Sequence, residues 1–108
     1  MEATTNKRER FGEIINGNTP VLVDFSAKWC GPCKMMKPVL EELHKRLGSK
    51  VRIIKIDIDQ SPAIAETLQI HSVPTLILFQ KGKPLWRQSG VLQASQLEKI
   101  ISPYSTTQ

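Results

Sequence analysis

The sequence contains little cysteine, little histidine and few aromatic residues. Two of its 108 residues are cysteine, two are histidine, and aromatic side chains make up 6%. A structural zinc site needs four ligands, and His44 and His71 do not lie at finger spacing from the two thiols. A chain of this length buries roughly two-thirds of the surface that its unfolded form exposes. It therefore does not need a disulfide in order to fold.

Long apolar runs are also absent. No stretch approaches the roughly 18 apolar residues that a membrane-spanning helix requires. The first residues, MEATTNKRERFGEI, are polar and lack the apolar segment of a secretory signal. These absences predict no membrane association and favour a reducing cytoplasm. In that compartment a pair of nearby cysteines is more often catalytic or metal-binding than structural.

Basic residues outnumber acidic ones, which gives a net charge of +5 and a pI near 9.5. The excess is in small clusters such as Lys7, Arg8 and Arg10, with acidic residues between them. Aromatic residues do not alternate with these charges, so nucleic-acid binding is not predicted. The basic residues are interpreted as a solvated surface, the alternative being weak steering of acidic protein partners.

Hydrophobic periodicity predicts one α/β domain over residues 1–108, with 1–6 and 103–108 as loose ends. Helical spacing of apolar residues alternates with short runs rich in β-branched residues. The predicted helices are 7–16, 32–47, 62–69 and 94–101, and the predicted strands are 21–25, 51–58, 75–79 and 85–89. Strand–helix–strand units imply parallel pairing, and the turn at Gly82 implies an antiparallel hairpin. The expected fold is a mixed sheet with helices on both faces.

Both cysteines lie in one heptapeptide, 28-KWCGPCK-34. Such a pair could hold a metal, act as a structural staple or transfer electrons. A staple that closes so short a loop would restrict the unfolded chain very little. A metal site would need further ligands that the sequence does not supply at suitable spacing. Electron transfer is therefore the favoured interpretation.

The position of the motif favours redox chemistry. It follows a predicted strand and opens the long helix, so Cys30 lies near the helix N-cap, where unpaired N–H groups and the helix dipole stabilise a thiolate. Lys28 and Lys34 add positive charge, and Pro32 suits the first helical turn. Cys30 is predicted to be the exposed nucleophile that forms a mixed disulfide. Cys33, about one turn into the helix, is predicted to resolve it.

The sequence resembles the thioredoxin family. The motif WCGPCK follows a VDF strand, VPT comes about forty residues later, and DFSAKW, KIDID, VPTLILF and Gly90 keep the same order between Phe11 and Ile101. The resemblance implies a thioredoxin fold with a central four- or five-stranded mixed sheet. The number of strands is left open because Ala3 to Asn6 do not read convincingly as a strand.

The same resemblance implies a cytoplasmic protein-disulfide reductase that takes part in electron transport and cell redox homeostasis. It implies a monomer with no bound cofactor beyond the Cys30–Cys33 disulfide. Electrons would come from a separate thioredoxin reductase, a flavin enzyme that uses NADPH, and would pass to disulfide-containing target proteins. Two alternatives stay open. One is a non-catalytic binding module or redox switch on the same fold, and the other is a disulfide oxidant.

Two charged residues match family positions near the cysteines. Asp24 lies inside an apolar run, and burial should raise its pKa, which makes it a candidate proton acceptor for the Cys33 thiol. The alternative is a hydrogen-bonded core aspartate with no kinetic role. Lys55 matches the family's lysine near this aspartate and is a candidate to pair with Asp24 and tune it. The alternative is an exposed lysine whose stem packs on the surface.

The resemblance also predicts a docking surface for substrate proteins. Pro74 in VPT matches the family's cis-proline, whose loop packs against the cysteines and offers backbone groups to an extended segment. For Val73 and Thr75 an ordinary role at the start of a strand is the alternative. The predicted docking residues are Trp29, Gly31, Pro32, Val73, Pro74, Thr75 and Gly90.

Overall fold

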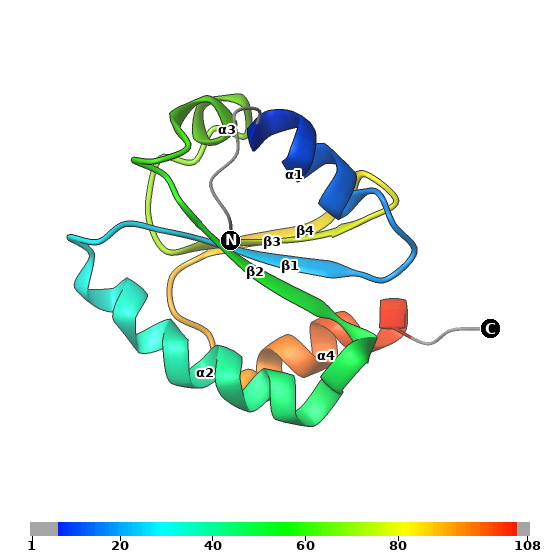
Figure 1. Ribbon diagram of the computed structural model, residues 1–108. Helices are drawn as coiled ribbons and strands as arrows, with labels where there is room; N and C mark the ends of the chain where they lie inside the picture. The colour runs from blue at the N-terminus through cyan, green and yellow to red at the C-terminus, as the bar shows by residue number, and fades with distance from the viewer. Residues whose placement is uncertain (1–6, 106–108) are drawn as a thin grey trace.

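The computed structural model describes residues 7–105, which form a sheet with helices packed on both sides (Figure 1). In chain order the elements are α1 (Lys7–Ile15), β1 (Val21–Ser26), α2 (Gly31–Leu47), a 3₁₀ turn (Gly48–Lys50), β2 (Arg52–Asp57), α3 (Pro62–Thr67), β3 (Thr75–Gln80), β4 (Lys83–Ser89) and α4 (Ala94–Ser105). All four helices and four strands predicted from periodicity are present within the described residues.

The strands form a mixed sheet in the order β2-β1-β3-β4. β1 pairs in parallel with β2, and its other edge pairs antiparallel with β3, which continues antiparallel to β4. Every residue of β1 is buried, as expected for an apolar strand with neighbours on both edges. The mixed sheet is thus confirmed, with four strands among the described residues. Residues 3–6, where a fifth strand was left open, lie outside them.

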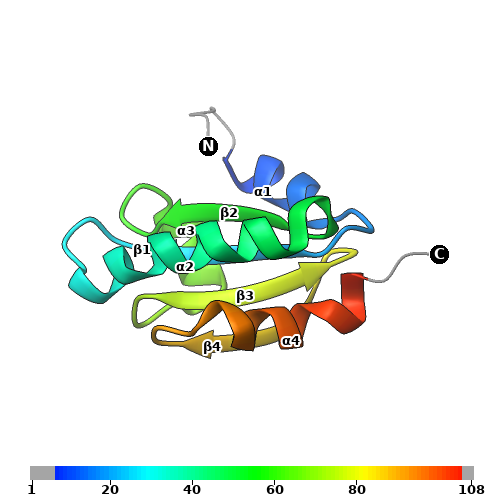
Figure 2. The ribbon, with the colours of Figure 1, turned by 90° about the horizontal axis from the view of Figure 1, so that it is seen from below.

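Side chains of β1 alternate between the two faces of the sheet. Val21, Val23 and Phe25 pack in a cluster with α1 and α3, whereas Leu22 packs with α2 and α4. Figure 1 shows the two helix pairs on opposite sides of the sheet, and Figure 2 shows α2 and α4 side by side across one face. The period of two places Asp24 on the same face as Leu22, toward α2. The strand pattern therefore directs one carboxyl group into an apolar layer.

Helix α4 extends to Ser105, so part of the tail predicted to be loose is helical. The side chain of Gln80 donates a hydrogen bond to the backbone oxygen of Tyr104 at 3.1 Å, and Ser105 is buried. Its hydroxyl donates to the oxygen of Ser102. These contacts hold a last turn whose residues have modest helix propensity, and for that reason periodicity alone ended the helix too early.

No helix within residues 7–105 is both long enough and apolar enough to cross a membrane.

Candidate active site

The two cysteines lie at the start of α2 and form a disulfide, with their Cα atoms 5.3 Å apart. Cys30 is the N-cap residue and has extended backbone angles (φ −93°, ψ 112°), and the helix begins at Gly31. Pro32 lies in the first turn, where its missing N–H costs no helical hydrogen bond. Cys33 follows within the same turn. The local sequence therefore fixes both sulfur atoms at one helix end.

The first turn of α2 directs a hydrogen-bond donor at the sulfur of Cys30. The backbone N–H of Cys33 donates to Cys30 Sγ, with an N–S distance of 3.1 Å. The helix dipole adds positive potential at this end. Both effects favour a negative charge on this sulfur over a charge on the sulfur of Cys33, which lies inside the turn. The arrangement is that of a thiolate nucleophile followed by a second thiol within reach.

The exposure of the cysteines differs from the prediction. Cys30 was expected to be the exposed member, but Cys30 and Cys33 are 4% and 3% exposed. Cys30 is covered because it packs in a small cluster with Ala27, Cys33 and the half-buried side chains of Ile58 and Val73. In the oxidised protein the difference between the two sulfurs therefore lies in their hydrogen bonding and not in their exposure.

The segment before β3 approaches the disulfide from the other side. The Val73–Pro74 peptide bond is cis, as the resemblance implies, and the backbone oxygen of Val73 lies 3.6 Å from Cys30 Sγ. In the disulfide this sulfur carries no proton, so the approach is a contact that becomes a hydrogen bond only with the reduced thiol. The N–H of Gly90 donates to the oxygen of Pro74 at 2.8 Å. Gly90 has φ +99°, which favours glycine.

The predicted docking residues differ in exposure. Trp29 is 70% exposed, and Gly31, Pro32 and Gly90 are also exposed around the disulfide. Val73 is half-buried, and Pro74 and Thr75 are buried. The hydroxyl of Thr75 donates to the oxygen of Ser72 at 2.7 Å, so its side chain points into the protein. A substrate could reach these last residues only through their backbone groups.

Asp24 is 1% exposed, and its Oδ1 atom has no hydrogen-bond partner. Burial raises the pKa of its carboxyl group from 3.8 to about 6, and the positive charge of Lys55 opposes this rise with a smaller effect. Register explains the influence of Lys55, which lies directly opposite Asp24 in the β1–β2 pairing. Lys55 is itself exposed, as the alternative interpretation of this residue supposes.

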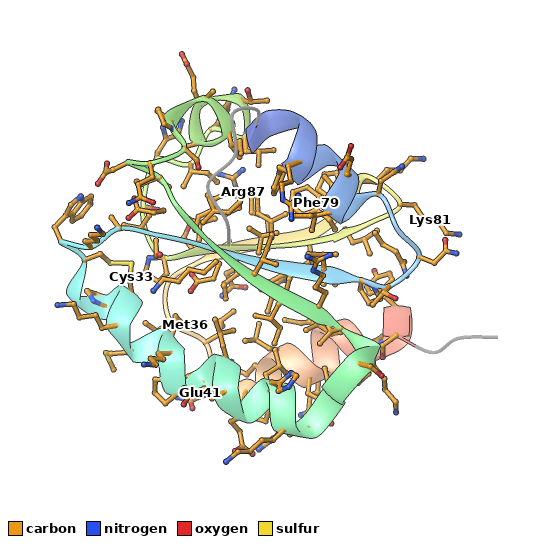
Figure 3. All side chains as sticks on the ribbon, viewed as in Figure 1. Cys33, Met36, Glu41, Phe79, Lys81 and Arg87 are labelled. Carbon is orange, nitrogen blue, oxygen red and sulfur yellow. A yellow bond between two sulfur atoms is a disulfide. The ribbon has the colours of Figure 1, made fainter. Side chains whose placement is uncertain are left out.

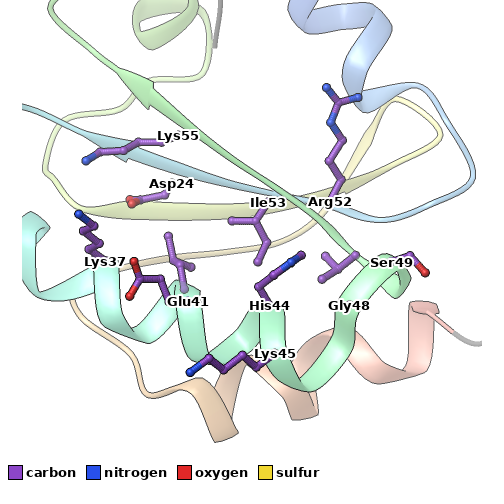
Figure 4. Close-up of a pocket in the computed structure, with 12 residues that line it drawn as sticks. Asp24, Lys37, Glu41, His44, Lys45, Gly48, Ser49, Arg52, Ile53 and Lys55 are labelled. Atoms are coloured by element: carbon purple, nitrogen blue, oxygen red, sulfur yellow. The ribbon is translucent and has the colours of Figure 1, made fainter.

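Asp24 lines a groove of about 970 Å³ between α2 and β2. Leu40, Val51 and Ile53 give the groove an apolar floor. Figure 4 shows the carboxyl of Asp24 with the side chains of Lys37 and Lys55 reaching toward the same end. Asp24 therefore lies at the wall of the groove, although its carboxyl group is almost wholly buried.

Metal ligands do not gather at this site. Within residues 7–105 no three side chains of the His, Cys, Asp and Glu types lie close enough together to hold a metal ion. His44 lines the groove on α2, whereas His71 is exposed on the segment before β3. The redox group of the site is the pair of cysteines itself (Figure 3).

The sequence did not single out Lys37, Asp59 or Arg87, which lie near the site. Lys37 lines the groove together with Asp24. The indole N–H of Trp29 donates to Oδ2 of Asp59 at 3.0 Å, which fixes the most exposed aromatic residue beside the disulfide. Arg87 on β4 donates to backbone oxygens that precede the Val73–Pro74 segment. Of these three residues, the sequence could have indicated only Asp59, the second aspartate of KIDID. A carboxylate that follows soon after a strand can accept a hydrogen bond from a neighbouring loop.

Comparisons with known proteins agree with this geometry. The sequence model of the family described as Thioredoxin matches residues 2–103. A thioredoxin-like protein of Synechocystis is 52% identical over 88 residues, which cover 81% of this chain and 84% of that protein. A bifunctional thioredoxin reductase/thioredoxin of Mycobacterium leprae is 44% identical over 92 residues, 85% of this chain but 20% of that longer protein.

Among solved structures, oxidised mitochondrial thioredoxin 3 of Saccharomyces cerevisiae superimposes with a TM-score of 0.78. The two sequences are 37% identical, and the match covers 88% of each chain. The four-stranded mixed sheet with helices on both faces is therefore the thioredoxin fold. The match to the family model, the relatives and the Cys30–Cys33 disulfide lead to one conclusion. The chain belongs to the thioredoxin family and is a protein-disulfide reductase whose redox group is its own cysteine pair.

Proposed function

We propose that the protein reduces target proteins by dithiol–disulfide exchange through a mixed disulfide, with Cys30 as the nucleophile and Cys33 as the resolving thiol. The observation that carries this assignment is the hydrogen bond from the N–H of Cys33 to Cys30 Sγ at the start of α2. A donor in that position stabilises the thiolate of Cys30 after reduction. The reaction then needs no metal and no bound organic cofactor.

The proposed exchange balances in two steps. The Cys30 thiolate attacks one sulfur of the target disulfide, a new S–S bond forms, and the other target sulfur leaves as a thiolate. The Cys33 thiol gives its proton to a base and attacks Cys30 Sγ. That attack restores the Cys30–Cys33 disulfide and releases the second target thiolate. Two electrons pass to the target, and its two thiolates take up two protons.

Asp24 is the proposed proton acceptor for Cys33, through a water molecule. A general base works best when its pKa lies near the working pH, and burial has raised the pKa of Asp24 to about 6. The unpaired Oδ1 atom is free to accept a hydrogen bond from water that enters along the groove. Lys55 is proposed to tune this base through its charge.

Docking of the target is proposed to use the exposed rim around the disulfide together with the backbone before β3. Trp29, Gly31, Pro32 and Gly90 supply the exposed rim. The backbone of Val73 would pair with an extended segment of the target, as in strand addition, and Pro74 and Thr75 would hold that backbone against the sheet. Such pairing is tolerant of sequence, which suits a reductase with several targets.

The proposed electron donor is a flavin-dependent thioredoxin reductase that uses NADPH. Support comes from the bifunctional relative of Mycobacterium leprae, whose name joins a thioredoxin reductase to a thioredoxin. We further propose that residues 1–108 act as a single monomeric domain in the cytoplasm, as expected from the chain length and the family resemblance.

Reduction of insulin disulfides tests the proposal, with dithiothreitol as the source of electrons. We expect turbidity to develop at a rate proportional to the protein concentration, and Cys30→Ser to abolish it. A binding module or redox switch would show no turnover in the presence of the same reductant. Measurement of the reduction potential separates a reductase from a disulfide oxidant, because an oxidant has a much less negative value.

A further inference from the structure

Two side chains of β4 hold the segment that carries Val73 and Pro74. The first is Arg87, which donates from two guanidinium nitrogens to the backbone oxygens of Leu68 at 2.5 Å and Gln69 at 2.6 Å. These oxygens follow the last turn of α3, where carbonyl groups have no helical partner and a cation is favoured. Arg87 therefore fixes the start of the segment.

The second side chain is Ser89, which fixes the end of the segment. Its hydroxyl lies 2.8 Å from the hydroxyl of Thr75 and accepts from that of Ser72 at 3.3 Å. Thr75 uses its one hydroxyl proton to donate to the backbone oxygen of Ser72 at 2.7 Å. Ser89 must therefore donate to Thr75, and the three hydroxyl groups form a directed chain.

Arg87 and Ser89 act on the same segment because they are two residues apart on one strand. Residues at this spacing face the same side of a sheet, and the register places Arg87 opposite Ile77 and Ser89 opposite Thr75. Ile77 belongs to the cluster on the α1 and α3 side. Figure 3 shows Arg87 on that side of the sheet. One strand thus anchors both ends of residues 68–75.

We propose that Arg87 and Ser89 set the position of the Val73–Pro74 segment over the disulfide, and thereby set how tightly protein substrates dock. This inference rests on the proposed function, in which that backbone pairs with an extended segment of the target. The oxygen of Val73 lies 3.6 Å from Cys30 Sγ, so a shift of the segment changes where the docking edge lies relative to the attacking sulfur. Arg87 is a positioning residue, because its contacts are with the segment and not with the cysteines.

The inference predicts a different effect on two kinds of substrate. A protein disulfide needs the backbone edge for docking, whereas a small aromatic disulfide such as 5,5′-dithiobis(2-nitrobenzoate) needs only access to the sulfur. In Arg87→Gln and in Ser89→Ala we expect KM for insulin to rise about fivefold, with kcat within about twofold of the parent. This pattern is expected when a mutation weakens substrate binding equally in the ground state and in the transition state. The rate with the small disulfide should stay unchanged.

Arg46→Gln is the matched control. Arg46 is, like Arg87, an exposed arginine with two hydrogen-bond partners, but these are the side chains of Glu42 within α2 and Glu98 on α4, away from the segment. Its KM for insulin should match that of the parent. Arg87→Lys keeps the charge and at least one donor, so its KM should fall between those of the parent and of Arg87→Gln.

The outcomes separate this inference from the proposed function. If the unmodified protein fails to reduce insulin, the proposed function is wrong. If it reduces insulin but Arg87→Gln and Ser89→Ala keep the parent KM, only the inference on β4 is overturned. An equal loss of activity with insulin and with the small disulfide would also overturn the inference on β4, because general destabilisation of the protein gives that result. Should Arg87→Gln fail to fold, Ser89→Ala decides the question, since it removes one hydroxyl from an exposed residue.

Discussion

Lys55 lies directly opposite Asp24 in the parallel pairing of β1 with β2, and its charge lowers the pKa of the buried carboxyl group. Burial acts in the opposite direction with the larger effect, so the pKa is raised from 3.8 to about 6. The carboxyl group therefore changes its charge within a pH range where the protein can be assayed. Both the catalytic role proposed for Asp24 and its effect on stability follow from this balance.

Replacing Asp24 with Asn should slow the release of the target from the mixed disulfide. General base catalysis contributes on the order of 100-fold or more, so we expect a loss of about that size near neutral pH. In the parent the rate should rise as the pH increases through about 6, the pKa of Asp24, and the variant should lack this rise. Single-turnover release from a preformed mixed disulfide between pH 5 and 9 measures both. Equal release rates for the parent and Asp24→Asn over the whole pH range would mean that Asp24 has only a structural role in the core.

The same substitution should stabilise the oxidised protein at alkaline pH. Because the pKa of folded Asp24 lies above 3.8, the native state binds its proton more tightly and loses stability as the pH rises from about 4 to about 6. A shift of about two units corresponds to about 3 kcal/mol, so the free energy of unfolding of Asp24→Asn at pH 8 should rise by up to that amount.

Denaturant unfolding at pH 4 and pH 8 checks this expectation. The gain should be present at pH 8 and absent at and below pH 4, where Asp24 of the parent is protonated. Glu41→Gln is a matched control, because Glu41 lines the same groove but is exposed. It should change stability little at either pH. A gain of equal size at both pH values would mean that packing, and not charge, produces the effect.

Replacing Lys55 with Gln should raise the pKa of Asp24 further above its ordinary value, because it removes the charge that lowers it. The rise should be modest, since Lys55 is exposed and water screens its charge. NMR titration of the Asp24 side-chain carboxyl carbon measures the pKa directly. Lys81→Gln provides the control at the turn between β3 and β4, at the other end of the sheet from Cys33 (Figure 3). If the pKa of Asp24 is the same in Lys55→Gln as in the parent, Lys55 does not influence the site.

Cys33→Ser should accumulate mixed disulfides with the physiological targets. Loss of the second thiol blocks the resolving step while leaving the first attack intact. Incubation of the reduced variant with cell lysate should give covalent adducts that dithiothreitol releases, for identification by mass spectrometry. Cys30→Ser is the matched control and should trap far fewer proteins. Similar adducts from both variants would show that the two sulfurs do not have separate roles.

The local sequence was sufficient to predict those parts of the site whose residues lie close together in the chain. The apolar run of β1, the helix start at Cys30 and the spacing of the two cysteines are all short-range patterns, and the structure has each of them. Asp24 was predicted to be buried because a carboxyl group inside a wholly apolar strand has no exposed face to occupy. A strand with this pattern allows few other arrangements.

Contacts between distant segments could not be predicted in the same way. Arg87 lies 18 residues after Gln69, and its pairing depends on where the end of α3 meets β4. Trp29 and Asp59 are separated by 30 residues. The exposure of Cys30 was mispredicted for a related reason, because Val73, which covers it, comes from a segment 43 residues away. Sequence periodicity describes one element at a time and does not specify which side chains meet between elements.

The small separation of the cysteines has a consequence for kinetics. Cys30 and Cys33 are three residues apart in one helical turn, and Val73 covers the sulfur of Cys30. In the proposed mechanism both partners dock on the rim around the disulfide, and that rim would hold one protein at a time. The partner that supplies electrons would then leave before the partner that receives them binds. Steady-state rates measured with both partners varied should accordingly follow a ping-pong pattern, with parallel lines in a double-reciprocal plot.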